Sequence, residues 1–221
     1  MIAKQLISEI IQPLKTSNTG TEALNWMNIF KVRHLPIVNN LNFLGLISED
    51  DIFDLNITDQ AIGNHKLSLN KAYVFNYEHI YVALKTIAEN NLTLLPVLDN
   101  DKNYQGVISS FDIIKYFSDL SNVSREGGII VLEINQHDYS LVEISNIIES
   151  NNAKILSLYV NSIPESTLLN ITIKVNVTDI SAITQTFNRY NYLIKFTFLE
   201  EDLTQELYQE RYEEFIKYLN I

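Results

Sequence analysis

The chain contains the same short phrase twice, and this internal duplication limits the folds open to it. The first copy runs Leu35-Pro36-Ile37-Val38, then Gly45-Leu46-Ile47-Ser48, then Asp51, and the second runs Leu95-Pro96-Val97-Leu98, then Gly106-Val107-Ile108-Ser109, then Asp112. The prolines lie 60 positions apart and the glycines 61, in a chain that has only 4 prolines and 6 glycines. Matched positions of such rare residues predict two copies of one structural unit.

Each copy predicts the same series of elements: a strand, a helix, two strands and a helix. Hydrophobic periodicity predicts the first helix over residues 21–30 in one copy and 79–90 in the other. Two apolar runs follow, joined by a turn rich in Asn or Asp, which is typical of a hairpin. The Ser-x-x-Asp phrase then opens the second helix, at residues 50–55 and 111–120.

These strands, turns and Ser-x-x-Asp phrases resemble those of the CBS domain, and two consecutive copies resemble a CBS pair, or Bateman module. The resemblance covers residues 1–122, with repeats at about 1–60 and 61–122. It implies an α+β fold in which the two copies pack together and leave two clefts where adenine nucleotides often bind. It also implies a regulatory module without catalytic activity, whose ligand would be AMP, ADP, ATP or another adenosyl compound.

The Ser-x-x-Asp phrase supplies groups that suit a nucleotide. Backbone N–H groups and the positive end of the helix dipole beside Ser109 or Ser48 favour a phosphate. An aspartate one turn later can accept hydrogen bonds from both hydroxyls of a ribose. Gly45 and Gly106 lack a Cβ and would let a ligand approach the strand closely. The same phrase is equally typical of a capping box, which satisfies only the N–H groups of the first helical turn.

The resemblance places the Ser-x-x-Asp phrase of one copy opposite the residues just before the Leu-Pro of the other. The predicted nucleotide site therefore consists of Thr16, Ser17, Val32, Arg33, His34, Ser109 and Asp112. A weaker second cleft would consist of Ser48, Asp51, Leu92, Thr93 and Leu94. Arg33 and His34 favour an anion in the first cleft, whereas the acids at 49–51 would repel one from the second by about a few kcal/mol. A solvated strand edge is the alternative interpretation of the two basic residues.

Residues 123–128 read as a linker, and residues 129–221 predict a second domain. Strands are predicted at 129–134, 153–160, 167–175 and 193–199, and helices at 140–150 and 180–190. This βαββαβ order resembles the ferredoxin-like ACT domain, a module that binds amino acids or mediates dimerisation. Amino-acid-binding members usually carry Asp-x-Pro-Gly before the first helix, and Tyr139 stands here in place of the glycine. Because its ring would block a small ligand, a packing or assembly role is favoured.

The last segment predicts a helix that ACT domains lack, starting from the capping box Asp202-x-x-Gln205. One face of it is apolar and consists of Leu203, Leu207, Tyr208, Tyr212, Phe215, Ile216 and Leu219. Such a stripe requires a cover: the sheet of the same domain, a second copy of the chain, or a groove on a partner. A CBS pair followed by an ACT-like module is similar in architecture to the acetoin utilisation proteins.

Composition excludes several classes of function. A net charge of −11 argues against nucleic acid and anionic membranes as partners. The chain has no cysteine, and its 4 histidines show no catalytic or metal-binding spacing, so we expect no enzyme activity and no metal site. No apolar stretch reaches membrane-spanning length, and Lys4 and Glu9 interrupt any signal peptide, so a cytoplasmic location is expected.

Two functions of different class remain open. The first is a regulatory protein that senses an adenosine-containing ligand and passes the signal to a protein target that the sequence does not identify. The second is a ligand-free dimerisation or scaffold protein that uses the same fold. In both cases we expect a homodimer, because CBS modules generally pair and closed two-fold symmetry is the commonest arrangement of a homo-oligomer.

Overall fold

A computed structural model describes residues 1–8, 10–54, 59–65 and 69–199. The chain divides into two compact units, Met1–Phe117 and Ser118–Ile221. The predicted C-terminal helix with its apolar stripe lies outside the described residues. Among the described helices, none is long and apolar enough to cross a membrane.

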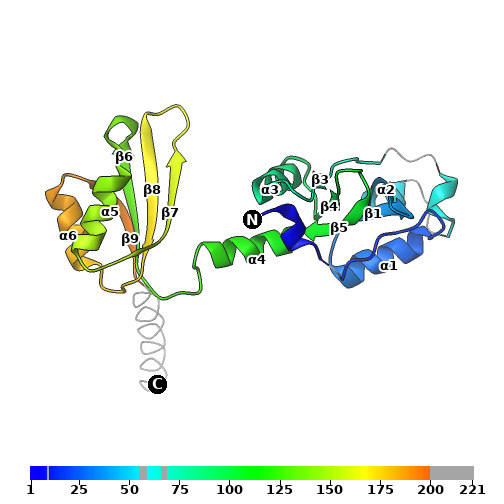
Figure 1. Cartoon of the computed structure of the whole chain (residues 1–221), viewed down its shortest axis with the longest axis horizontal. Helices are drawn as coiled ribbons and strands as arrows, with labels where there is room; N and C mark the ends of the chain where they lie inside the picture. Colours follow the sequence, from blue (N-terminus) through cyan, green and yellow to red (C-terminus); the bar gives the residue numbers. More distant parts are fainter. Residues whose placement is uncertain (9, 55–58, 66–68, 200–221) are drawn as a thin grey trace, which may run out of the picture. The chain divides into compact units, whose positions relative to one another are not determined.

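The first unit contains both repeats, and each shows the predicted order of elements (Figure 1). The first repeat consists of η1 (Ala3–Leu6), α1 (Gly20–Phe30), β1 (His34–Asn39), β2 (Asn42–Ser48) and α2 (Glu49–Asp54). The second consists of η2 (Ile62–Asn64), β3 (Val74–Phe75), α3 (Ile80–Glu89), β4 (Leu94–Leu98), β5 (Tyr104–Ser109) and α4 (Ser110–Leu120). The predicted helices that the structure describes end within about one residue of these bounds.

The two repeats share the details of their strand pairing, which confirms the duplication at the level of backbone. In each hairpin the register shifts at one place, between Ile37 and Val38 in the first repeat and between Val97 and Leu98 in the second. Such a shift marks a β-bulge. One expected strand is shorter than its counterpart: β3 pairs in parallel with β4, whereas its equivalent in the first repeat is a single parallel bridge between Leu14 and Ile37.

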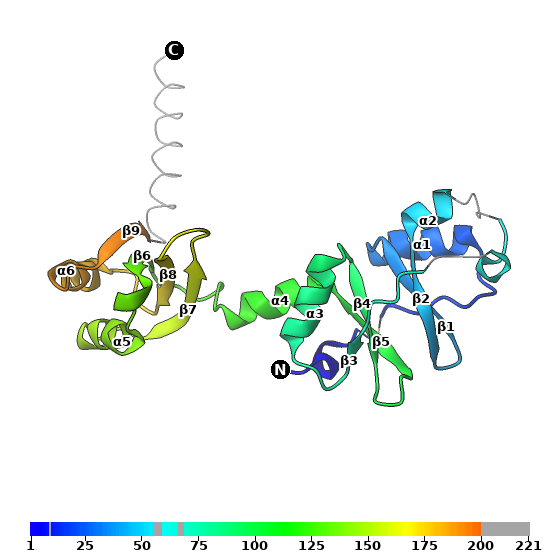
Figure 2. The same cartoon turned by 90° about the horizontal axis from the view of Figure 1, so that it is seen from above.

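The first segment of each repeat, which we call the exchanged segment (residues 2–8 in the first repeat, 61–65 and 69–70 in the second), packs on the other repeat. The N–H of Ala3 donates to the carbonyl of Glu78 at 2.9 Å, and the N–H of Ile62 donates to the carbonyl of Asn18 at 2.8 Å. These two contacts are equivalent, because Asn18 and Glu78 lie 60 positions apart. Figure 2 shows both hairpins and the N-terminal end of the chain from above. The exchange joins the repeats into one hydrophobic core that includes Ala3, Ile62, Leu35 and Leu95.

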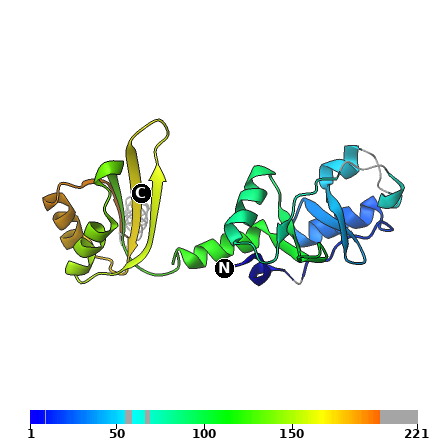
Figure 3. The same ribbon diagram turned by 45° about the horizontal axis from the view of Figure 1, so that its top comes forward.

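The second unit is a four-stranded antiparallel sheet with two helices on one face (Figures 1 and 3). Its elements are β6 (Ile129–Asn135), η3 (Gln136–Asp138), α5 (Leu141–Ser150), β7 (Ile155–Ser162), β8 (Leu168–Val175), α6 (Ser181–Arg189) and β9 (Leu193–Phe198). The strand order β7-β8-β6-β9 is that of a ferredoxin-like fold. Alternate residues of β6 and β8 are buried, as expected for a sheet covered on one side.

A short turn after α4 belongs to this second unit through three contacts. The hydroxyl of Tyr159 bonds to that of Ser121, and Asn122 Nδ2 donates to the carbonyl of Leu156 at 3.0 Å. Lys174 Nζ also donates to the carbonyl of Val123 at 3.2 Å. These contacts tie the turn to β7 and β8, so the second unit begins before residue 123.

Candidate functional site

The starts of β1 and β4 meet at the centre of the first unit. Arg33 and Thr93 occupy the same position in the two repeats, since they lie 60 residues apart. The N–H of Arg33 donates to Thr93 Oγ1 at 3.0 Å. Equivalent positions of the two repeats therefore contact each other. Such a contact lies near the pseudo-two-fold axis that relates the repeats.

Both Ser-x-x-Asp helices begin beside this contact. The N–H of Glu49, the first residue of α2, donates to the carbonyl of Arg33 at 3.0 Å. In the same way the N–H of Ser110, the first residue of α4, donates to the carbonyl of Thr93 at 3.0 Å. We call Arg33, His34 and Thr93, together with the helix starts at 48–51 and 109–112, the junction.

The serine and aspartate of each phrase form a complete capping box. Asp112 Oδ2 accepts from Ser109 Oγ at 2.6 Å and from the Ser109 N–H at 3.1 Å, while Ser109 Oγ accepts from the Asp112 N–H at 3.1 Å. Asp51 and Ser48 make the same three hydrogen bonds, at 2.6, 2.8 and 3.0 Å. Both phrases therefore make the hydrogen bonds of a capping box. In each case only Oδ2 of the carboxylate takes part in these bonds.

Arg33 is the principal cation of the junction, and it faces the acids of its own repeat. Its Nε lies 3.5 Å from Glu49 Oε2, and its Nη2 lies 3.3 Å from both carboxylate oxygens of Asp50. The side chains of Arg33 and Asp50 are 62% and 73% exposed, so water screens this ion pair and its strength is small. The acids that we expected to repel an anion thus lie beside the arginine that we expected to attract it.

His34 joins the repeats through its ring. Nδ1 accepts from the N–H of Thr93 at 3.3 Å and lies 3.0 Å from Thr93 Oγ1. A backbone N–H can only donate, so Nδ1 carries a lone pair and the neutral ring holds its proton on Nε2. Burial lowers the pKa of His34 below its ordinary value of 6.5, and the charge of Arg33 lowers it further. Asp51 and Asp50 act in the opposite direction.

The remaining predicted site residues are either buried in the hydrophobic core or lie outside the junction. Val32, Leu92 and Leu94 are buried, so their side chains belong to the hydrophobic core of the pair. Thr16 Oγ1 donates to Asn39 Oδ1 at 3.2 Å, and Ser17 is exposed. The carbonyls of Arg33 and Thr93 accept from the helix starts and His34 bonds to Thr93, whereas the side chain of Thr16 bonds to Asn39.

The two matched glycines have a different role from the one we expected. Both have a φ near +150°, and a Cβ on Gly106 would overlap the side chain of Ile7, while one on Gly45 would overlap Leu69. Ile7 and Leu69 belong to the exchanged segments. The space beside each glycine is therefore occupied by the chain itself and is not available to a ligand. Sequence reasoning missed the exchange because residues 2–8 and 61–70 do not share a recognisable phrase.

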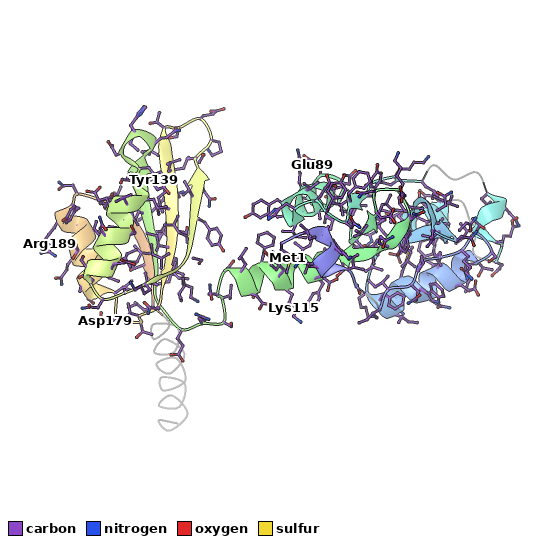
Figure 4. All side chains as sticks on the ribbon, viewed as in Figure 1. Met1, Glu89, Lys115, Tyr139, Asp179 and Arg189 are labelled. Carbon is purple, nitrogen blue, oxygen red and sulfur yellow. The ribbon has the colours of Figure 1, made fainter. Side chains whose placement is uncertain are left out.

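The second unit holds Tyr139 and two surface cavities near it. Tyr139, labelled in Figure 4 where α5 begins, packs against the hydrophobic core of this unit. A cavity of about 340 Å³ is lined by Glu133, Asp138, Glu143 and Tyr192, among others. The hydroxyl of Tyr192 donates to Glu143 Oε2 at 2.6 Å, and burial together with this carboxylate raises the pKa of Tyr192.

The comparison with protein families agrees with this geometry. Residues 71–119 match the family model described as the CBS domain. Residues 71–119 are identified as a CBS domain. The preceding repeat has the same shift of strand register, the same helix caps and an equivalent contact of its first segment, so the first unit has the duplicated architecture of a CBS pair, and a ferredoxin-like unit follows it.

Solved structures that are similar to part of this chain include the following three. A CBS domain pair/ACT domain protein from Thermotoga maritima is 24% identical, covers 54% of this chain and 98% of its own, and has a TM-score of 0.48. An acetoin utilization protein from Vibrio cholerae is 16% identical, covers 56% and 95%, and has a TM-score of 0.48. A CBS domain pair solved with 5′-methylthioadenosine and S-adenosyl-L-methionine is 22% identical, covers 54% and 97%, and has a TM-score of 0.44.

Proposed function

We propose that this protein is a non-catalytic regulator whose CBS pair binds an adenosine-containing nucleotide at the junction. The observation that carries the proposal is the single residue Thr93, whose backbone and hydroxyl bond to Ser110, Arg33 and His34. Through Thr93 the N-terminus of α4 is connected to the two basic residues of the other repeat. This connection supports the proposed grouping of Ser109 and Asp112 with Arg33 and His34.

The N-terminus of α4 and Arg33 would bind the phosphate. A helix start carries a partial positive charge, and Ser109 and Asp112 hold its first turn in place. The guanidinium of Arg33 is held only by exposed ion pairs, so it can exchange Glu49 and Asp50 for a phosphate at small cost. One arginine suits a monophosphate or an adenosyl compound of low charge better than a triphosphate.

Asp112 would bind the ribose. Ser109 holds Oδ2 at 2.6 Å and so fixes the orientation of the carboxylate before any ligand arrives. Oδ1 then remains to accept from the ribose hydroxyls. A preorganised carboxylate loses little side-chain entropy on binding, which favours affinity.

A scaffold function without a ligand is the alternative, and the two complete capping boxes favour it. Asp51 and Asp112 make identical bonds although their surroundings differ in charge, which is what capping alone would require. In either function we propose a cytoplasmic homodimer, whose surfaces would also bind a protein target. Sedimentation at micromolar concentration would test the dimer: a mass near 25.5 kDa would contradict it.

Calorimetry and thermal shift with AMP, ADP, ATP, NADH, a cyclic dinucleotide and S-adenosylmethionine would test the nucleotide function. A ligand at one hundred times its dissociation constant should stabilise the protein by about 2.7 kcal/mol. Binding that depends on Asp112 supports the proposal. Failure of every adenosine compound to bind would overturn it and favour the scaffold.

A further inference from the structure

A histidine nitrogen that accepts a hydrogen bond from a backbone N–H loses that bond when the nitrogen is protonated. His34 Nδ1 accepts from the N–H of Thr93 at 3.3 Å, and the Thr93 hydroxyl lies 3.0 Å from the same nitrogen. The hydroxyl oxygen already accepts from the N–H of Arg33 at 3.0 Å, so its own proton is available to donate to Nδ1. The neutral ring therefore receives two hydrogen bonds from one residue of the other repeat.

We propose that His34 is a proton-sensitive clasp between the two repeats: the neutral ring accepts from the N–H of Thr93, and the protonated ring releases this amide. A proton from solvent would occupy the lone pair of Nδ1 and turn this acceptor into a donor. It would then face the N–H of Thr93, a second donor that cannot reverse its role. The hydrogen bond from the Thr93 amide is lost in that arrangement, whereas the Thr93 hydroxyl can turn to accept from Nδ1.

Within the described part of the two repeats, this clasp occurs once. The counterpart of His34 in the second repeat is Leu94, a buried apolar residue whose side chain cannot accept a hydrogen bond. Protonation therefore releases a backbone amide on the His34 side, while the side chain of Leu94 does not respond to protons.

The charged groups around His34 decide where it titrates. Arg33 on the same strand disfavours the protonated ring, and Asp50 and Asp51 on α2 favour it, while Thr93 on the facing repeat carries no charge. Burial is the largest influence and lowers the pKa below 6.5. The unfolded chain then binds more protons than the folded one, so the stability from the clasp is complete above about pH 6.5 and is lost as the pH falls through the folded pKa.

The clasp needs no ligand, so it can be tested independently of nucleotide binding. Nitrogen-15 NMR of the ligand-free chain should show the Nε2–H tautomer of His34 at about pH 7.5. Hydrogen exchange of the Thr93 amide, corrected for its intrinsic rate, should then quicken by up to about tenfold for each pH unit between pH 6.5 and the folded pKa.

Two variants and a control separate the clasp from general acid sensitivity. His34→Asn places an amide oxygen near the position of Nδ1, so it should protect the Thr93 amide equally at neutral and acid pH. His34→Leu, the residue of the second repeat, should expose this amide at every pH. His137→Gln in the second unit should behave as the wild type. An Nδ1–H tautomer, a midpoint at or above pH 6.5, or equal pH dependence in wild type and His34→Asn would overturn the proposal; should His34→Leu fail to fold, the wild-type titration and His34→Asn still decide it.

Discussion

Asp112 Oδ2 lies 2.6 Å from Ser109 Oγ, and this hydrogen bond has an exact counterpart between the equivalent residues of the first repeat. The two aspartates are thus matched in structure but differ in surroundings. Three acids follow one another at the start of α2, whereas Asp112 is the acid of the first turn of α4. Substitution of each aspartate in turn can therefore separate ligand binding from helix capping.

Asp112→Ala should weaken binding of an adenosine ligand about tenfold to a hundredfold, because it removes a charge-assisted contact worth about 1.5 to 3 kcal/mol. Asp51→Ala is the matched control and should change affinity much less. Both substitutions remove a cap and should lower the free energy of unfolding by about 1 kcal/mol. Calorimetric titration distinguishes them: equal affinity of wild type and Asp112→Ala would show that this carboxylate does not hold the ribose.

The acids beside Arg33 should reduce affinity for anionic ligands. In the double variant Glu49→Gln/Asp50→Asn the guanidinium loses both ion-pair partners, so AMP should bind roughly twofold to tenfold more tightly. Adenosine carries no phosphate and serves as the control ligand, with unchanged affinity. If the substitutions alter AMP and adenosine equally, Arg33 does not contact the phosphate.

The sequence predicted most of the backbone of both units, because the signals are local. Apolar periodicity and turn residues located the hairpins, whereas the register shift beside Gly45 and Gly106 was not predicted. The contacts between the repeats were not predictable in the same way. Thr93 was assigned to the weaker cleft by its position before Leu95-Pro96, yet its hydrogen bonds connect both repeats. Arg33 was expected to face the helix start of the second repeat, whereas its ion-pair partners are Glu49 and Asp50 of its own repeat.

Gly106→Ala should destabilise the first unit by about 1 to 3 kcal/mol, since its φ of +146° is unfavourable for a residue with a Cβ and the added atom would overlap Ile7. Adding Ile7→Ala removes the overlap but not the backbone strain. Urea unfolding of the two single variants and the double variant forms a cycle. A double variant as unstable as the sum of the singles would show that the glycine is required by backbone conformation alone, and not by close packing of the exchanged segment.

Tyr192→Phe should destabilise the second unit by about 1 kcal/mol, because it removes the hydrogen bond to Glu143 and leaves the carboxylate without its partner.

The hydrogen bond between Tyr192 and Glu143 also predicts that the stability of the second unit depends on pH in the alkaline range. Burial and the Glu143 carboxylate raise the pKa of Tyr192 above its ordinary value of 10.0, so the folded unit holds this proton more tightly than the unfolded chain. Stability from Tyr192 is therefore complete below about pH 10 and is lost as the pH rises beyond it. Unfolding of the wild type and Tyr192→Phe between about pH 8 and pH 11 would measure this, with Tyr190→Phe as the control for a neighbouring exposed tyrosine. Loss of stability at alkaline pH should be smaller in Tyr192→Phe than in the wild type and in Tyr190→Phe; the same loss in all three would show that the hydrogen bond to Glu143 does not govern the titration of this ring.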